Sequence, residues 1–339
     1  MKTHTSREGG GALTGMRAAP GGSEIPAVGE ACGFKDGRLE AILRESMRKH
    51  RRRAELADRA ATAVTWCAAA AGLGILLFVV VAILARGLGT ALDPGFVFGK
   101  PQALKEGGGI WPMVVSSLYL AVLTMLIVVP VGVGAAVYLA EFAREGRITH
   151  LVRFGADTLS TMPSVVFGIF GMVLFVIHFG LGYSLLAGAL TLTLLNLPTI
   201  MRAAEESIKA VPDSYREASL ALGAGRWETV KKVVLPSAMP GITTGAVLAM
   251  GRILGESAAV IYTVGIFVRK IPLSPLNPAA PMATHIWHAY TEGALVSDWM
   301  RVANGEAAFL LLVVLALNMV AHLVARLYTR KSGTVREDA

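Results

Sequence analysis

The sequence predicts an all-α integral membrane protein that crosses the membrane with six helices. Hydrophobic residues make up 54% of the 339 residues and charged residues only 17%, and the mean hydropathy is +0.56. A soluble core could not use that much apolar surface. Several uncharged stretches approach the roughly 20 residues that a helix needs to cross about 30 Å of hydrocarbon. Basic residues gather in alternate connections between these stretches.

The expected spans follow one another along the chain. The stretch from Thr158 to Met201, broken only by His178, is too long for one helix, and the turn residues from Gly180 to Tyr183 divide it into the third and fourth spans. The other spans are Trp66 to Ala85, about Pro112 to Ala140, about Gly241 to Val268 and about Ala307 to Ala325.

The distribution of Lys and Arg gives the expected orientation. Six basic residues lie between Arg48 and Arg59, before the first span, and six more lie between Arg202 and Lys232. The turn from Gly180 to Tyr183 has none. Because cytoplasmic loops near the membrane are enriched in these residues, both termini are expected on the cytoplasmic side of the inner membrane.

The segments that flank the spans differ in composition. Residues 1–45 are rich in Gly and small residues, which predicts a disordered cytoplasmic extension and no signal peptide. Residues 46–64 suit a basic amphipathic helix on the inner lipid surface, although a solvated helix would explain them equally well. The membrane domain is expected over residues 65–325, and a cytoplasmic tail over residues 326–339.

Several chemistries are not expected of this chain. Its two cysteines, Cys32 and Cys67, suggest neither a disulfide nor a metal site, and the spacing of His285 and His288 is not that of a metal cluster. Gly99-Lys100 is followed by Pro101, so no phosphate-binding loop is present and the chain is not expected to hydrolyse nucleotide or act as an enzyme. The net charge of +8 follows from membrane topology, and nucleic acid is not an expected partner.

The connection between the fourth and fifth spans predicts a helix-turn-helix. Ser214 and Glu217 have the spacing of a capping box, in which each side chain pairs with the other residue's backbone N–H, so a helix should begin near Tyr215. Gly223 can take the left-handed conformation that closes it. A second helix from Arg226 to Val234 should stop at Pro236.

This connection has more apolar residues than a free loop would expose. It could pack on the protein's own helices, or it could read DNA, although both of its ends are tied to membrane spans. It could also dock its first helix into a groove of another protein.

The spacing of the connection resembles the EAA loop of ABC-importer permeases. Glu217-Ala218-Ser219, three residues, Gly223, nine residues and Val233-x-Leu235-Pro236 fit throughout, with Ser219 and Val233 replacing the family's usual Ala and Ile. The resemblance implies a type I permease fold whose loop supplies the coupling helix for a cytoplasmic ATPase. It assigns that coupling role to six residues: Glu217, Ala218, Ser219, Gly223, Leu235 and Pro236.

A wider set of motifs resembles the PstA-type subunits of phosphate importers. It includes Leu197-Pro198-x-Ile200-x-Arg202 and Gly255-Glu256-Ser257-Ala258, and the resemblance covers roughly residues 60 to 325. The sister PstC-type permeases are similar. The resemblance implies a phosphate importer in which this chain assembles with a PstC-type permease, a PstB-type ATPase dimer that binds ATP and Mg²⁺, and a PstS-type phosphate-binding protein. No cofactor of its own is implied.

Charged residues inside the fifth span indicate a substrate path. A charge near the centre of a span costs about 2.5 to 3.5 kcal/mol, so Arg252 and Glu256, one helical turn apart, should face an interface or each other. Phosphate suits the planar guanidinium, which makes Arg252 a ligand candidate and Glu256 its positioner. The resemblance adds Arg202 as a second contact. A structural salt bridge, and ordinary positive-inside placement of Arg202, remain open.

Two other functions compete with phosphate import. A permease for another oxyanion, sulfate or molybdate, would keep the coupling loop without needing the Arg252 and Glu256 pair. A channel or secondary transporter would explain charges inside the membrane, but would leave the helix-turn-helix unexplained and would usually show an internal repeat.

Overall fold

A computed structural model describes residues 37–101, 108–144, 146–266, 270–292 and 298–333 of the chain. All regular structure in these ranges is helical, which confirms the all-α class. The chain divides into two units, residues 1–75 and 76–339, and the boundary falls inside the first described helix, α2 (Gly37–Ala91).

Helix α2 is longer than the predicted first span. It contains the whole stretch from Trp66 to Ala85, and residues 46–64 belong to the same helix, while most of the extension expected over residues 1–45 lies outside the described residues. In the second unit, Gly87 of α2 meets helix α13 (Trp299–Gly333), where a Cβ atom would come within 2.0 Å of the Asn304 carbonyl oxygen. A small residue is therefore required at this contact.

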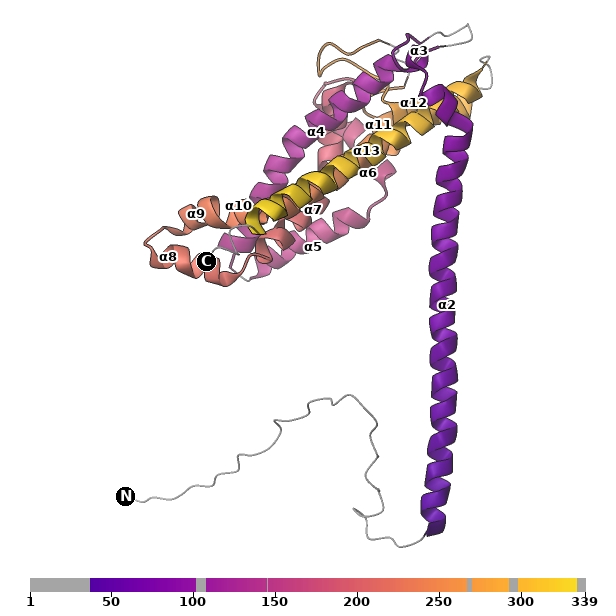
Figure 1. The fold of residues 1–339 in the computed structure, drawn as a ribbon. Coiled ribbons are helices and arrows are strands. Elements are labelled where there is room, and N and C mark those ends of the chain that lie inside the picture. Colours follow the sequence, from indigo (N-terminus) through magenta and orange to yellow (C-terminus); the bar gives the residue numbers. More distant parts are fainter. Residues whose placement is uncertain (1–36, 102–107, 145, 267–269, 293–297, 334–339) are drawn as a thin grey trace. The chain divides into compact units, whose positions relative to one another are not determined.

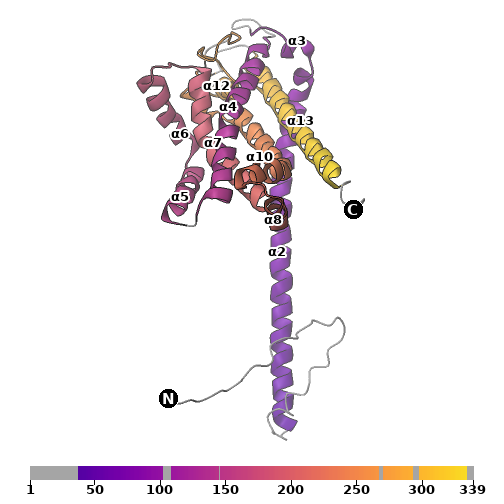
Figure 2. The same cartoon turned by 90° about the vertical axis from the view of Figure 1, so that its left-hand side faces the viewer.

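Four long helices form the centre of the second unit (Figures 1 and 2): α4 (Trp111–Val137), α7 (Leu185–Lys209), α10 (Leu235–Gly255) and α13. Helix α4 packs along α7, and α10 packs against both α7 and α13. Gly132 of α4 lies so close to α7 that a Cβ atom would sit 2.7 Å from Ile200 Cγ2. Such close approach is how helices associate where burial in lipid gives no hydrophobic gain.

The long uncharged stretch is divided where predicted. Gly180 and Gly182 both have positive φ, at 66° and 62°, and they form the turn that precedes α7. The span before the turn has a 102° bend between α5 (Arg147–Thr161) and a helix that runs through α6 (Ser164–Gly171) and the π-helix η2 (Met172–His178). Pro163 explains this bend, because it disfavours helical geometry at the preceding Met162. The five long apolar helices and this bent pair agree with six spans.

The fifth span differs from its prediction at both ends. Helix α10 follows directly on α9 (Arg226–Thr229) and the π-helix η3 (Val230–Val234), so Pro236 does not stop the helix. Pro236 lies at the start of α10 after the π-helical turn, where a missing N–H is tolerated. At the other end α10 stops at Gly255, and a one-turn helix, α11 (Ala258–Ile261), follows.

Different short helices lie at the two ends of the helical bundle. At one end lie α8 (Asp213–Ala221) and α9, and at the other lie α3 (Pro94–Val97) and α12 (Met282–Glu292), as both views show (Figures 1 and 2). The backbone N–H of Met282 donates to Ser117 Oγ of α4 at 2.8 Å, which fastens the α12 segment to the bundle. Helix α13 runs to Gly333, past the predicted end of the sixth span.

Candidate coupling loop and substrate path

The predicted helix-turn-helix is present, but its first helix begins differently. Helix α8 begins at Asp213 with Pro212 at the N-cap and has no side-chain cap, so the expected capping box of Ser214 and Glu217 is wrong. Ser214 is already inside the helix, where its hydroxyl cannot accept from the first free N–H groups. The acidic side chain of Asp213 in the first turn favours this earlier start.

The turn between α8 and α9 agrees with the prediction. Gly223 has a φ of 85°, and its N–H donates to the Leu220 carbonyl at 2.9 Å. No atom lies within 4 Å of where a Cβ would be, so backbone conformation and not crowding requires glycine here. The hydroxyl groups of Ser219 and Thr229 lie 2.9 Å apart and join the two helices.

The loop exposes apolar side chains to its surroundings. No residue of α8 is buried, and Leu222 is 90% exposed and Trp227 62% exposed. Glu217 and Ala218 are exposed as well, whereas Val230 and Val234 of η3 are buried in the bundle. Self-packing therefore accounts for η3 but leaves α8 and the turn as an uncovered surface. Leu235 and Pro236 lie apart from this surface, at the start of α10.

The structure separates Arg252 from Glu256. Helix α10 ends at Gly255 and Glu256 has extended backbone angles, so the two residues do not share a helix face as the sequence suggested. Glu256 Oε1 instead accepts from the Ala259 N–H at 3.4 Å, at the start of α11. Among the described residues no ion pair or hydrogen bond is found for the exposed Arg252 side chain. The open alternative of an Arg252–Glu256 salt bridge is therefore wrong.

The glycines of α10 face two different environments. A Cβ on Gly241 would come within 2.4 Å of Ser207 Oγ, and one on Gly245 within 2.6 Å of Ala203 Cβ, so this half packs tightly on α7. Gly255 has nothing within 4 Å. The first pair thus serves packing within the chain. Near Arg252, Gly251 packs on Asn318 and Val314 of α13, so only the side of α10 that carries Arg252 and Gly255 is open.

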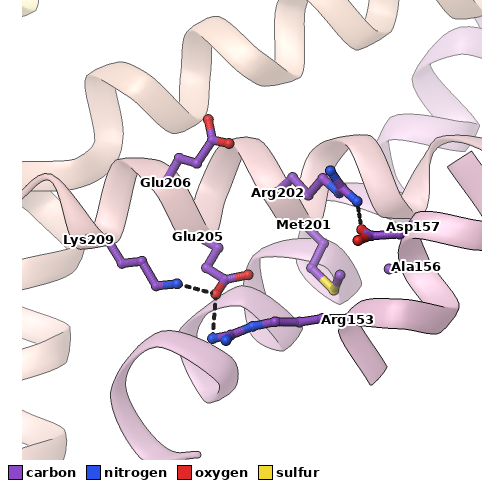
Figure 3. A pocket seen from close by; sticks show the side chains of 8 residues that line it. All are labelled: Arg153, Ala156, Asp157, Met201, Arg202, Glu205, Glu206 and Lys209. Carbon is purple, nitrogen blue, oxygen red and sulfur yellow. Dashed lines mark hydrogen bonds and ion pairs between the residues drawn. The ribbon is translucent and has the colours of Figure 1, made fainter. Parts of the chain in front are cut away.

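Arg202 lies in a charged cavity of about 260 Å³ between α5 and α7 (Figure 3). It forms an ion pair with Asp157 of α5, which the sequence did not predict. In the same cavity the buried Glu205 carboxylate lies 2.8 Å from Arg153 Nη2 and 2.6 Å from Lys209 Nζ. Only the i,i+4 spacing of Glu205 and Lys209 was visible in the sequence.

The structure does not bring Arg202 and Arg252 together. Gly245 faces Ala203 and Gly241 faces Ser207, so α10 and α7 run antiparallel. Continuing this register places Arg252 level with Asn196, about 9 Å along the helix axis from Arg202 at roughly 1.5 Å per residue. Neither Arg252 nor Glu256 lines the cavity around Arg202.

His285 and His288, for which the sequence predicted no metal role, lie in α12, at the end of the bundle opposite the coupling loop. His285 Nδ1 lies 2.6 Å from Glu306 Oε2, which is completely buried in α13. Within the described part of the chain, no group of three or more His, Cys, Asp or Glu residues could hold a metal ion.

Comparisons with known proteins agree on one family. The family described as "Binding-protein-dependent transport system inner membrane component" matches residues 129–333. The probable ABC transporter permease protein YqgI of Bacillus subtilis (strain 168) is 39% identical over 289 residues, which are 82% of this chain and 98% of that protein. The phosphate transport system permease protein PstA 1 of Mycobacterium tuberculosis (strain CDC 1551 / Oshkosh) is 36% identical over 226 residues, 66% of this chain and 73% of that protein.

A solved structure shares the fold. A chain of the MetNI methionine ABC transporter, described in inward-facing conformations, superposes with a TM-score of 0.50 and 22% identity. The match covers 65% of this chain and 94% of the other.

Proposed function

The chain belongs to the binding-protein-dependent transport system inner membrane components, and we propose that it is the permease subunit of an ATP-driven importer of inorganic phosphate. The family makes it a multi-pass membrane subunit of an ABC importer and implies a substrate-binding protein and an ATPase as partners. Similarity to a relative named as a phosphate permease supports the choice of phosphate.

The observation that carries this proposal is the Arg252 side chain. It is an exposed cation in the last turn of the apolar helix α10, not near its centre, and no acidic side chain of the described residues neutralises it. A charge inside a span is costly unless it faces a polar path or a partner. A guanidinium can bind two phosphate oxygens in its plane, so a site lined by Arg252 would attract the anion.

The site is incomplete within one subunit. The surface beside Gly255 and Arg252 is open, so we place the translocation path between this chain and a PstC-type sister permease. Glu256 would orient the site through its bond to Ala259 N–H, and Arg202, held by Asp157, would contact the anion nearer the cytoplasm.

The exposed α8 surface supports docking of an ATPase. Glu217, Ala218 and Leu222 lie where a groove of another protein can reach them, and this end of the bundle has the basic residues expected on the cytoplasmic side. We propose a PstB-type ATPase dimer there, a PstS-type phosphate-binding protein at the α12 end, and both termini in the cytoplasm.

Reconstituted vesicles test the substrate and the energy source together. The chain, its sister permease and the ATPase are placed in proteoliposomes with the ATPase and ATP on the inside. The binding protein and labelled phosphate are added outside, and uptake of the label is measured. Uptake should need ATP and should resist excess sulfate or molybdate. Uptake without ATP would support a channel or secondary transporter instead, and full competition by sulfate would support another oxyanion.

The role of Glu256 can be tested in the same vesicles. Glu256→Gln keeps an oxygen that can accept from Ala259 N–H but removes the negative charge. Normal uptake by this variant would show that Glu256 acts only by accepting the hydrogen bond from Ala259 N–H. Loss of uptake with intact assembly would support a charge role beside Arg252.

A further inference from the structure

The coupling loop has a side-chain attachment to the bundle, in addition to its covalent connections to α7 and α10. The attachment point is the π-helix η1 (Tyr138–Phe142), which ends α4. Glu141 of η1 accepts hydrogen bonds from Arg216 of α8. Arg216 Nη2 and Nε lie 2.8 Å and 3.1 Å from Glu141 Oε1. Both side chains are largely buried, at 19% and 10% exposure.

Arg216 is fixed from several directions. Its Nη1 also donates to the Val211 carbonyl at 2.7 Å, and its Nη2 donates to the Ile208 carbonyl at 2.9 Å, at the end of α7. Charge-assisted bonds to a planar guanidinium define both position and orientation. Arg216 therefore connects α8 with the ends of α4 and α7 at one point.

The second helix of the loop reaches the same place. Arg226 Nη2 donates to the Glu141 carbonyl oxygen, and its guanidinium carbon lies 5.4 Å from the centre of the Phe142 ring. The Trp227 ring also contacts Phe142, in a tilted arrangement with 6.1 Å between the two ring centres. Both helices of the loop are thus attached to one turn of η1.

Apolar packing is a weak attachment for α8. Helix α8 has no buried residue, and its other contacts are with α9 and η3 of the same loop, including the Ser219–Thr229 pair. Its only largely enclosed side chain with several bonds to the bundle is Arg216, among the residues described. A movement of α8 would therefore reach α4 through Arg216 and Glu141.

We propose that Glu141 and Arg216 are positioning residues that transmit movement of the docked α8 to α4, in addition to the continuous helix that leads from α9 into α10. This inference rests on the proposed function, because it assumes an ATPase at α8. Helix α4 then carries the movement along α7, against which it packs closely at Gly132 and Ile200. The two routes would move α4 and α10 together.

The test compares uptake with ATP consumption in the complete transporter. Arg216→Met and Glu141→Gln remove the ion pair, and Arg216→Lys keeps the charge but not the fork of donors. Glu228→Gln is the matched control, because Glu228 forms an exposed ion pair with Lys232 at 2.6 Å on the same loop. Co-purification of the ATPase, ATP hydrolysis and phosphate uptake are measured for each.

Arg216→Met and Glu141→Gln should retain the ATPase and its hydrolysis, while phosphate taken up per ATP falls about 10-fold. Arg216→Lys should lose less, about threefold, and Glu228→Gln should match the unaltered protein. Unchanged uptake per ATP in Arg216→Met would overturn the proposal. Loss of the ATPase from that variant would also overturn it, since the pair would then only hold the loop in place.

A covalent replacement gives an independent measurement. In a chain with Cys32→Ser and Cys67→Ser, the Glu141→Cys and Arg216→Cys pair is joined by a disulfide-forming linker that reduction cleaves. Linked protein should recover uptake per ATP and lose it after reduction in the same sample. Equal coupling before and after reduction would contradict the proposal. If the unaltered transporter takes up no phosphate while its ATPase is active, the proposed function fails instead.

Discussion

Arg216 and Arg252 are opposite cases of an arginine near the membrane. Arg216 has bonds to two carboxylates, those of Glu141 and Asp213, and to two backbone carbonyls, and it is 19% exposed. Arg252 is exposed and has no such bond among the described residues. A cation whose donors are satisfied within the chain has a structural or positioning role. One left unsatisfied in the last turn of an apolar helix is available to a partner from outside the chain, either another subunit or the substrate.

The strongest test of this contrast is Arg252→Met. If the guanidinium binds phosphate oxygens, loss of about 1.5 to 3 kcal/mol of charge-assisted bonding should lower uptake about 10- to 100-fold. Thermal stability of the purified chain should not change, because no described contact is lost. Uptake assays and a melting curve on the same preparation measure both. Normal uptake would remove Arg252 from the path, and a large loss of stability would show an unrecognised structural role.

The uncovered face of the coupling loop should respond next most strongly. Leu222→Asp places a charge on a side chain that is 90% exposed, so folding should be unaffected. If Leu222 enters a groove of the ATPase, burying that charge should weaken association about 10-fold. A binding titration of the ATPase with detergent-purified permease measures it. Lys231→Asp, at another exposed position of the loop, is the control for charge alone.

The two halves of α10 provide a matched pair of glycine substitutions. Gly245→Ala brings a methyl group within 2.6 Å of Ala203 Cβ and should lower stability by about 1 to 3 kcal/mol, as overpacking does. Gly255→Ala meets nothing within 4 Å and should leave the isolated chain as stable as before. Denaturation in detergent compares them. Equal stability of the two variants would contradict the packing described for α10.

Arg202→Met should lower stability only slightly. Its ion pair with Asp157 joins side chains that are 46% and 57% exposed, and exposed pairs contribute about 0 to 1 kcal/mol. Uptake should fall less than about threefold if Arg202 only pairs with Asp157. A loss comparable to that of Arg252→Met would instead support the second phosphate contact inferred from the resemblance. Asp157→Asn, which breaks the same pair, separates the two explanations.

Local signals in the sequence were sufficient for most of the fold. The turn at Gly180 and Gly182 and the turn at Gly223 were predictable, because their positive φ values favour glycine wherever they occur. The predictions were wrong where the effect of one residue depends on the conformation of the residues before it. Pro236 was expected to end a helix, but a π-helical turn before it removes the conflict. Ser214 was expected to cap a helix that Pro212 and Asp213 begin earlier.

The candidate site was predictable as a set of residues but not as an arrangement. Arg252 and the exposed residues of α8 stood out from their composition and spacing. The partners Asp157 and Glu141 did not, since they lie 45 and 75 positions away in the sequence from the arginines they bind. No local pattern encodes contacts over such separations.

The sequence by itself determined that the protein is helical, that it spans a membrane, and that its basic loop carries a helix-turn-helix. These properties depend on apolar length, charge placement and turn residues, which act over a few neighbouring positions. Only the tertiary structure decided that Glu256 leaves the helix of Arg252 and that Arg216 is bound by Glu141. Which charges are paired depends on how distant helices pack, and that packing alone fixes which arginine remains available to a partner.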